Sequence, residues 1–532
     1  MDSPTLHRRL GALAYVWLAL VAVLAAELRA PWLDETFAIE RARGSLADVL
    51  AVNRGFEANP PLYYVALHYW LAFGESAFAT RALSIASAIA ALYLVRRAAH
   101  MLGGERAADV AGVVFAASAV QQYYAHEARA YMPGLALSLA AGHLAGLHLM
   151  TPASSSRVRA LRLGGYALTT ALAGYTLYYA WLATASQVLA MAAVALASAP
   201  AERRLLLRRT WEILAAGVIA LVLYAPEIYY LAVKAEGFFG LVGTGGVASG
   251  VPQTLPDTFR QDWLNRVCAF LVGFQWSPLD RGFATACLGL ALAIGAGALA
   301  FVTRAARAPD TRAAALLAGG QAFLPWLLLL AIPFRPHRFE CKHLLFALPW
   351  LGIVLALPFA SARRPRWAWL VIGAFLAANL HGTWHMLLSE KEDWPLAWSE
   401  LASEVRPGDL VLTTPVYLRV PLHANRPPDG PLLQLVYAKD DVHACSVSWV
   451  GRPGAPRPRL AAPGHGPWIA LARASGARVF VVRGISNVAI PDASLAAQLD
   501  VAGFVADDEP TVLPGGAGSN GTLLVLERYS AR

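Results

Sequence analysis

The sequence has few charged residues and few cysteines for its length. Of its 532 residues, 15% are Asp, Glu, Lys or Arg and 57% are hydrophobic. So little charge excludes the three or four soluble domains that the length alone would suggest, by a rough count of about 150 residues per domain. The four cysteines form no CxxC pair and have no metal-ligand spacing, so their pattern leaves a disulfide open and assigns none.

Nucleotide-binding and nucleic-acid-binding signals are weak as well. The glycine-rich segment GLVGTGGVASGVPQ lacks the spacing that cradles phosphates, and it reads equally well as a mobile loop over a groove or as a plain linker. The net charge of +9 comes from arginines clustered in short segments between apolar runs. That pattern is typical of cytoplasmic loops in membrane proteins, so it does not indicate nucleic acid.

Long apolar runs dominate what is present, and about eleven are long enough to span a bilayer. The predicted spans are residues 10–28, 81–99, 109–125, 131–150, 164–180, 182–199, 211–232, 282–302, 314–333, 341–360 and 367–388. The arginine clusters fall between alternate spans, and the positive-inside rule makes that side cytoplasmic. The N-terminus is then predicted inside, and both residues 29–80 and the C-terminal part are predicted outside.

The predicted fold is therefore a polytopic α-helical membrane protein with a C-terminal α/β domain. Residues 1–389 form the membrane domain, whose first outer loop (29–80) carries an interfacial helix at 62–78; a second interfacial helix is expected at 262–276. After residue 389 the proportion of turn residues rises, which predicts a soluble extracytoplasmic domain over 390–532. Its expected strands are 409–415, 477–484 and 521–529, its expected helices lie near 394–405 and 494–503, and GGAGSNG is read as a hairpin turn.

The adjacent carboxylates Asp34 and Glu35 are the first candidates for catalysis. They follow the first span in the sequence PWLDETFAI, where Trp32 and Phe37 supply apolar surface that could desolvate one carboxyl group. A solvated pair of loop carboxylates is the simpler interpretation. Their place beside the outer face of the membrane favours Asp34 as a general base, with Glu35 an equal choice between a catalytic and a structural role.

Two further constellations place positive charge on the predicted outer side. YYAHEARAY holds Arg129, which could bind a phosphate or could form a local ion pair with Glu127. The stretch PFRPHRFECKHLLFALP runs against the positive-inside rule, which favours an anionic ligand over ordinary headgroup contact. The candidate substrate-binding residues are Asn59, Tyr63, His126, Glu127, Arg129, Tyr131, Arg338, Lys342 and His343.

Several of these motifs occur together, in order, over about residues 30–394. They are LDE, NPPLYY, FGESAFATRALS, YYAHEARAY, the basic stretch before LLFALP, and KEDW. The ordered set resembles the membrane glycosyltransferases that use polyprenyl-phosphate sugars, namely the dolichyl-phosphate-mannose protein mannosyltransferases and bacterial relatives that include the lipid A aminoarabinose transferases. The resemblance implies the GT-C fold and a catalytic carboxylate in the first outer loop.

The resemblance also implies roles for individual residues. Asp34 matches the acidic residue that contacts the acceptor, Arg129 matches the arginine of the QEAR-Y stretch, and Lys342 stands where relatives have an arginine facing the lipid phosphate. In two places the sequence departs from the pattern. Asn59 replaces a histidine, and Lys342-His343 replaces Arg-Tyr, so the expected phosphate contact is a point charge.

The expected reaction is transfer of a hexose or pentose from a polyprenyl-phosphate donor to a hydroxyl or amine of a protein, lipid or glycan, with inversion at the anomeric carbon. No cofactor is required; a divalent metal is compatible with the composition, but the spacing of the histidines does not support one. A lipid or glycan flippase is the main alternative, and an O-antigen ligase or polymerase is a second. The Ala-, Arg- and Gly-rich composition suggests a bacterial inner membrane with a periplasmic active face.

Overall fold

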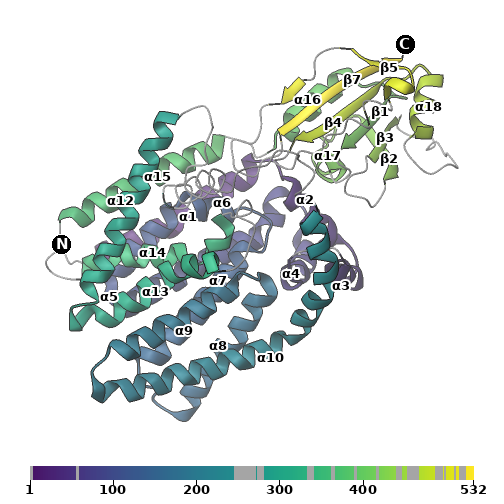
Figure 1. Ribbon diagram of the computed structural model, residues 1–532. Coiled ribbons are helices and arrows are strands. Elements are labelled where there is room, and N and C mark those ends of the chain that lie inside the picture. The colour runs from purple at the N-terminus through teal and green to yellow at the C-terminus, as the bar shows by residue number, and fades with distance from the viewer. Residues whose placement is uncertain are drawn as a thin grey trace. The chain divides into compact units, whose positions relative to one another are not determined.

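A computed structural model describes most of the chain, and Figure 1 labels its helices and strands. The described residues are 4–55, 59–244, 271, 281–331, 341–360, 366–388, 392–414, 418–438, 446–451, 466–485, 495, 499–507, 511–513 and 523–531. The chain divides into two compact units. Unit 1 comprises Met1–Glu27, Arg41–Gly240 and Pro252–Leu387, and unit 2 comprises Leu28–Glu40, Leu241–Val251 and Leu388–Arg532.

All the regular secondary structure described in unit 1 is helical. Its elements are α1 (Pro4–Leu28), α3 (Leu46–Gly55), α4 (Leu62–Trp70), η1 (Leu71–Phe73), α5 (Ala77–Ala117), α6 (Ala119–Ala125), α7 (Tyr131–Met150), α8 (Ser156–Thr176), α9 (Ala180–Ala197), α10 (Pro200–Thr244), α12 (Arg281–Ala305), α13 (Pro309–Ala331), η3 (Cys341–Leu344), α14 (Ala347–Ala356), η4 (Leu357–Ala360) and α15 (Arg366–Leu388). Within the described residues, seven helices are long and apolar enough to cross a membrane: α1, α5, α7, α9, α10, α13 and α15. The chain is thus a multi-pass membrane protein.

The predicted spans 81–99 and 109–125 meet in α5, which is kinked at Gly104. The backbone there has φ 76° and ψ −172°, a conformation that glycine adopts without a steric penalty. The prediction of one continuous span over 109–125 is wrong, because α5 ends at Ala117 and α6 begins at Ala119. Such a break leaves backbone groups unpaired, and in a bilayer these groups need protein partners.

The buried side chain of Asn379 on α15 supplies one of those partners. Its Oδ1 accepts the N–H of Ala119 at 3.0 Å, which satisfies the first amide of α6. Its Nδ2 donates to the carbonyls of Leu271 and Phe375 at 3.1 and 2.9 Å. A polar residue inside an apolar span is therefore explained by the broken helix that it supports.

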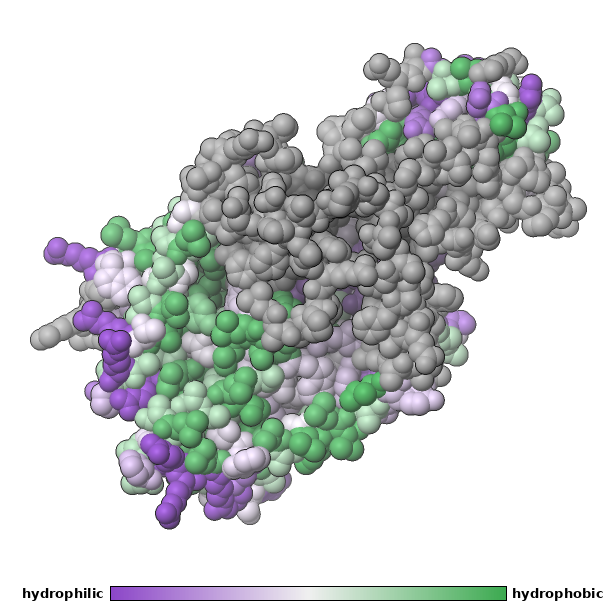
Figure 2. All heavy atoms as spheres, in the orientation of Figure 1, coloured by the Kyte–Doolittle hydropathy of each residue, from purple (hydrophilic) through white to green (hydrophobic). Residues whose placement is uncertain are grey.

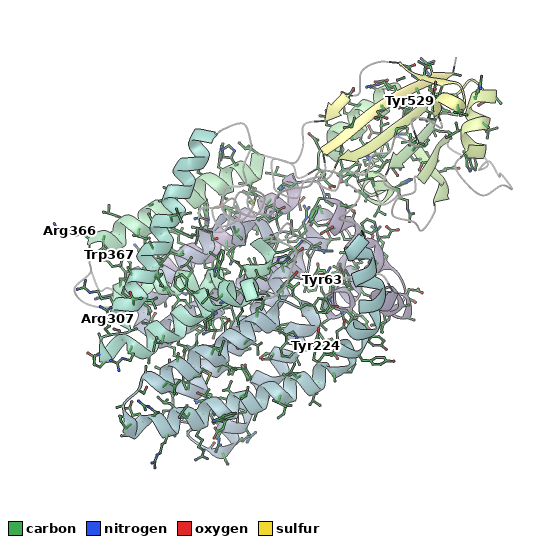
Figure 3. The ribbon with its side chains drawn as sticks, viewed as in Figure 1. Tyr63, Tyr224, Arg307, Arg366, Trp367 and Tyr529 are labelled. Atoms are coloured by element: carbon green, nitrogen blue, oxygen red, sulfur yellow. The ribbon has the colours of Figure 1, made fainter. Side chains whose placement is uncertain are left out.

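The surface of unit 1 matches a protein surrounded by lipid. Figure 2 shows hydrophobic residues over the helices on the face drawn, with hydrophilic residues gathered at one end. Arg307 and Arg366 lie at that end of the unit in Figure 3. An arginine-rich end and an apolar flank are what the positive-inside rule predicts for the cytoplasmic side.

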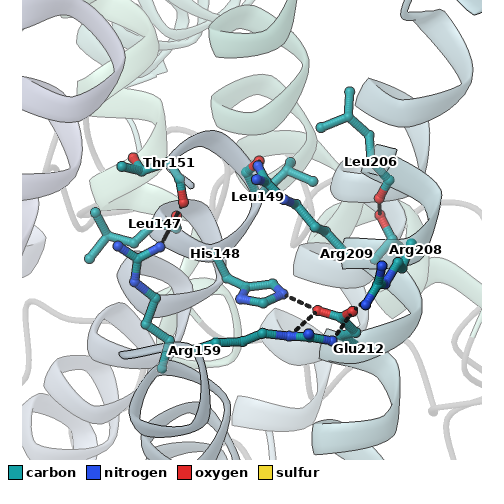
Figure 4. A network of polar contacts seen from close by, with 11 residues as sticks. Leu147, His148, Leu149, Thr151, Arg159, Leu206, Arg208, Arg209 and Glu212 are labelled. Atoms are coloured by element: carbon teal, nitrogen blue, oxygen red, sulfur yellow. Dashed lines mark hydrogen bonds and ion pairs between the residues drawn. The ribbon is translucent and has the colours of Figure 1, made fainter. Parts of the chain in front are cut away.

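Arginines near this end also satisfy backbone groups at helix ends. Arg162 donates to the carbonyls of Leu147 and Thr151 at the end of α7, and Arg209 donates to the carbonyl of Leu149. Figure 4 shows these contacts beside a second network, in which the Glu212 carboxylate of α10 accepts from His148, Arg159 and Arg208. The arginines therefore join α7, α8 and α10.

A second ion cluster joins α1 to α5. The buried carboxylate of Asp109 contacts His7 Nδ1 at 2.5 Å and accepts from Arg96 Nη2 at 3.0 Å. Glycines make room for this arginine, because a Cβ at Gly11 would lie 2.7 Å from Arg96 Nη2. The glycine at position 11 thus leaves room for the arginine side chain that packs against the first span.

Unit 2 is built on a mixed sheet of seven strands. They are β1 (Leu410–Thr414), β2 (Leu432–Ala438), β3 (Ser446–Gly451), β4 (Val479–Ile485), β5 (Phe504–Ala506), β6 (Thr511–Leu513) and β7 (Leu523–Ala531). The order is β2-β3-β1-β4-β7-β5, with β6 also paired to β7. Only β1 and β4 pair in parallel among these strands.

Alternate residues of the strands face two apolar cores, one on each side of the sheet. Val411 and Phe480 join the core that contains α16 (Trp394–Glu404) and α17 (Arg419–Ala424). Leu412 and Val481 face the other core, with residues of α18 (Gly466–Ala474). The period-2 pattern of the strands thus buries both faces of the sheet.

The predicted strands coincide with β1, β4 and β7, and α16 coincides with the helix expected at 394–405. The strands β2 and β3 were not predicted. Strands β6 and β7 pair antiparallel on either side of GGAGSNG, as the hairpin reading expects, while the turn itself lies outside the described residues.

Other predicted boundaries need correction. The helix expected over 62–78 ends at Phe73, because Gly74 has φ 137° and Ser76 then caps α5 by accepting the N–H of Ala79. The helix α10 continues to Thr244, so the start of the glycine-rich segment is helical. The helix predicted at 262–276, apart from Leu271, and all four cysteine side chains lie outside the part that the structure describes.

Candidate active site

The carboxylates Asp34 and Glu35 lie in the first turn of α2 (Leu33–Arg43), which belongs to unit 2 as far as Glu40. A proline at residue 31 precedes the helix, and Thr36 fixes its first turn by donating through N–H to Trp32 O and through Oγ1 to Leu33 O. Acidic residues suit this position, because unpaired N–H groups and the helix dipole favour negative charge there. Asp34 is half-buried.

Glu35 has a visible structural contact. Its carboxylate accepts the N–H of Trp32 at 3.4 Å, which is the return contact of a capping box. The side chain is only 1% exposed. The catalytic role of Glu35 stays a prediction, while its hydrogen bond to the Trp32 N–H caps the start of α2.

Glu392, from the KEDW motif, holds the start of α2 from 359 residues further along the chain. Its Oε2 accepts the N–H of Leu33 at 3.0 Å and the Nε1–H of Trp394 at 2.8 Å. A carboxylate from a distant segment thus satisfies an amide at the helix N-terminus. Asn425 adds a second tie, donating from Nδ2 to Pro31 O at 3.0 Å, and Leu33 packs against the core around Trp394.

The YYAHEARAY turn of unit 1 is buried except for its first residue, Tyr123, which is half-buried. His126, Glu127, Arg129 and Tyr131 are 1%, 2%, 8% and 4% exposed. The N–H of Arg129 donates to Glu127 O at 2.7 Å, and Ser84 of the FATRALS motif donates to Arg129 O at 3.3 Å. The guanidinium carbon of Arg129 lies 5.8 Å from the ring centre of Tyr131.

The ring of His126 contacts the helix that precedes it. Its Nδ1 lies 2.8 Å from Gln122 O, so that nitrogen carries the proton in this contact. Arg81, also from FATRALS and 1% exposed, donates to Ala26 O at the end of α1 at 2.7 Å. The FATRALS motif therefore contacts the C-terminal end of α1 and the turn that follows α6.

The basic stretch is described only from Cys341 onward, and Arg338 lies outside the described residues. Lys342 and His343 form part of the short helix η3, with Lys342 half-buried and His343 8% exposed. The His343 ring lies over Tyr179, with centroids 4.1 Å apart and planes tilted by 33°. Tyr179 lies in the turn between α8 and α9, so η3 packs against that turn.

NPPLYY begins helix α4. Pro61 occupies the N-cap position, where a missing N–H costs nothing, and Asn59 is half-buried just before it. Tyr63 and Tyr64 are each 2% exposed and meet edge to face at 5.9 Å. Figure 3 labels Tyr63 on this helix. Both rings are thus packed inside the protein.

The sequence reasoning missed a buried carboxylate nearby in the fold, Glu227 of α10. It is 5% exposed, and its Oε1 accepts from the Tyr178 hydroxyl at 3.0 Å. Tyr178 precedes Tyr179, the residue that contacts His343. The available signals were the acidic residue in APEIYY and the paired tyrosines in TLYYAW.

Metal binding finds no support in the part of the chain that the structure covers. Among the described residues, no group of three or more His, Cys, Asp and Glu side chains could hold a metal ion. The expectation that no metal is required stays a prediction.

The whole fold is that of the GT-C glycosyltransferases, multi-pass membrane proteins. The crystal structure of ArnT from Cupriavidus metallidurans in the apo state is similar at TM-score 0.56 and 15% identity, covering 97% of both chains. The same protein bound to undecaprenyl phosphate is similar at TM-score 0.54 and 14% identity, again over 97% of both chains. No protein-family model and no curated protein sequence matches the chain.

Proposed function

We propose that this protein is a glycosyltransferase that moves a hexose or pentose from a polyprenyl-phosphate donor to a hydroxyl or amine. The acceptor belongs to a protein, a lipid or a glycan. The observation that carries the proposal is the GT-C fold, shared with ArnT over 97% of each chain. Support for a lipid phosphate as donor comes from the ArnT structure that contains undecaprenyl phosphate.

The proposed chemistry is a single displacement at the anomeric carbon. The bond from that carbon to the phosphate oxygen breaks, a bond to the acceptor oxygen or nitrogen forms, and the polyprenyl phosphate leaves with the bonding electrons. Asp34 takes the proton that the acceptor loses, which is worth on the order of 10²–10⁴ in rate. Arg129 and Lys342 stabilise the charge that develops on the leaving phosphate. One displacement inverts the configuration of the sugar.

The proposed setting is a bacterial inner membrane crossed about eleven times. The arginine-rich end of unit 1 faces the cytoplasm, and unit 2 faces the periplasm. No nucleotide site is needed, because the donor reaches the enzyme already activated by its phosphate. The reaction requires no cofactor on this proposal.

The first test is transfer or hydrolysis of radiolabelled sugar from synthetic undecaprenyl-phosphate sugars by the purified protein. We expect Asp34→Asn to lower turnover by about 10²–10⁴, with donor binding retained, because the amide cannot accept the proton. The matched control is Glu40→Gln on the exposed side of the same helix, which we expect to be as active as wild type.

Each alternative result has a distinct meaning. A wild-type protein that moves the lipid across vesicles without breaking the sugar–phosphate bond is a flippase, and the proposal fails. A wild-type protein that neither binds nor consumes any such donor contradicts it as well. Full activity in Asp34→Asn would leave the enzyme class standing and remove the assignment of the base.

A further inference from the structure

Glu227 is a buried carboxylate whose only hydrogen bond within the described residues is the one it accepts from Tyr178. No described Lys, Arg or His forms an ion pair with it. A carboxylate inside a membrane protein is costly to keep, and such residues commonly serve binding or transport. Glu212, on the same helix, shows the contrast, because it contacts one histidine and two arginines.

The backbone around Glu227 is also unusual. Pro226 lies inside α10 and has no N–H to give to the carbonyl four residues earlier. Tyr175 of α8 donates its hydroxyl to the next carbonyl, that of Leu223, at 3.0 Å. Pro226 leaves a backbone carbonyl without its helical partner, and Glu227 places a carboxylate inside the protein. Both features are unfavourable in a helix that only has to cross the bilayer.

Aromatic rings line the same region. Tyr224 packs against Tyr175 and Trp181, with ring centroids 4.9 and 5.2 Å apart, and Figure 3 labels Tyr224 on α10. Trp181 follows the turn that holds Tyr178 and Tyr179. Carboxylates that accept from neighbouring hydroxyls, together with aromatic rings that pack on C–H faces, are well suited to bind a sugar ring.

The position of this cluster relates it to the candidate phosphate-binding residues. Tyr179 stacks on His343, the neighbour of Lys342, and Tyr178 turns from the same short connection toward Glu227. All of these residues belong to unit 1. A lipid phosphate held at Lys342 would therefore carry its sugar at the α8–α9 turn.

We propose that Glu227, oriented by Tyr178 and flanked by Tyr224 and Trp181, forms the subsite for the sugar ring of the donor, where its carboxylate accepts hydrogen bonds from adjacent ring hydroxyls. This inference rests on the proposed function, since it requires a lipid-linked sugar donor. It assigns the selection of the sugar to a residue distinct from the base and from the phosphate-binding cations.

The test compares binding of two kinds of probe to the full-length protein in nanodiscs. One is undecaprenyl phosphate, and the other is undecaprenyl phosphate carrying mannose, glucose, galactose or arabinose. We expect Glu227→Gln to lower the binding affinity for the preferred sugar-bearing probe roughly 10- to 100-fold, because hydrogen bonds to a charged group are lost. Binding of undecaprenyl phosphate itself is expected to stay within about twofold and also reports that the variant is folded.

Two further variants separate this role from a structural one. Tyr178→Phe should lower the affinity for the sugar-bearing probe less than Glu227→Gln does, because it removes only the hydroxyl that orients the carboxylate. Glu212→Gln removes a carboxylate from the ion network of the same helix; it should lower the melting temperature and leave the ratio of the two affinities unchanged.

The outcomes distinguish this inference from the proposed function. Equal losses for both probes in Glu227→Gln, or no loss for either, overturn the subsite while the enzyme class stands. A wild-type protein that binds no sugar-bearing probe better than undecaprenyl phosphate overturns it too. A wild-type protein that binds neither probe removes the proposed function, and the subsite falls with it.

Discussion

Glu404 illustrates how single side chains set the response of unit 2 to acid. Its carboxylate accepts from Arg528 Nε at 2.8 Å and from Nη2 at 2.6 Å. These hydrogen bonds are the main cause that lowers the pKa of Glu404 below its ordinary value of 4.5. A lowered carboxyl pKa contributes stability above pH 4.5, and the contribution is lost as the pH falls through the folded value.

His423 also makes unit 2 less stable on acidification, and its effect begins at a higher pH than that of Glu404. Burial, followed by the nearby charges of Arg419 and Arg426, lowers the pKa of its imidazole below 6.5. The folded protein favours the neutral ring, which contacts Ser448 Oγ at 3.1 Å. The contribution is complete above pH 6.5 and declines as the unfolded chain takes up the proton below that value.

At the residue scale, we therefore predict that unit 2 loses stability in two stages on acidification. Hydrogen exchange of β7 in the full-length protein, measured from pH 7 to 3, should show faster opening first below pH 6.5 and again below pH 4.5. Arg528→Gln should abolish the second stage. The control is Arg473→Gln, because this exposed arginine donates to Ala502 O and forms no described ion pair. An unchanged second stage in Arg528→Gln would contradict the assignment.

At the scale of the element, helix α2 depends on contacts that its own sequence does not contain. Its first amide donates to Glu392, and Pro31, two residues before the helix, accepts a hydrogen bond from Asn425 at its carbonyl. The segment that carries Asp34 is thus fixed by residues from the C-terminal part of the chain. The KEDW motif therefore has a structural role, which is to accept a hydrogen bond from the start of α2. The sequence alone did not indicate this role.

Removing that support should impair the reaction more than donor binding. We predict that Glu392→Ala lowers kcat by about 10- to 100-fold through loss of a charge-assisted hydrogen bond, with little change in the KM for the donor. Glu392→Gln, which keeps an acceptor oxygen, should restore part of kcat. A rise in KM with an unchanged kcat, or no rescue by glutamine, would show that Glu392 does not position the base.

The elements that could be predicted from sequence are those with a local signal. Leu410–Thr414 and Val479–Ile485 are β-branched runs bounded by turn residues, and both became central strands. Strands β2 and β3 were missed, because LLQLVYA and SVSWVG lie among prolines and glycines that suggest loops. The break at Ser118 was missed because the partner of the freed amide, Asn379, is 260 residues away.

The candidate site divides in the same way. Asp34, Arg129 and His343 were proposed as site residues because polar residues in an apolar chain stand out. Glu227 was passed over because APEIYY ends a long apolar run and reads as the tail of a span. Its pairing with Tyr178, 49 residues earlier, is a tertiary contact that no local pattern predicts.

For the whole molecule, the arrangement of arginines predicts which side each part faces. We expect a cysteine at Arg307 to resist a membrane-impermeant maleimide in intact cells, and a cysteine at Val501 to react. Both positions are exposed, with Val501 at 86%, so the difference reports the membrane and not burial. The four native cysteines are replaced by serine in the background, and permeabilised cells give the full signal. Labelling of Arg307→Cys alone would reverse the predicted orientation, and labelling of both positions would contradict the prediction that they lie on opposite sides.

The contact between Leu33 and Glu392 also has a consequence for how the protein is made. The glutamate that accepts the N–H of Leu33 is synthesised 359 residues after the segment that carries Asp34. At about 5–20 residues per second, the segment waits roughly 20–70 s for its partner. During that interval the spans between them enter the membrane. A nascent chain arrested anywhere before residue 392 therefore carries Asp34 without the hydrogen bond that Glu392 makes with the start of α2.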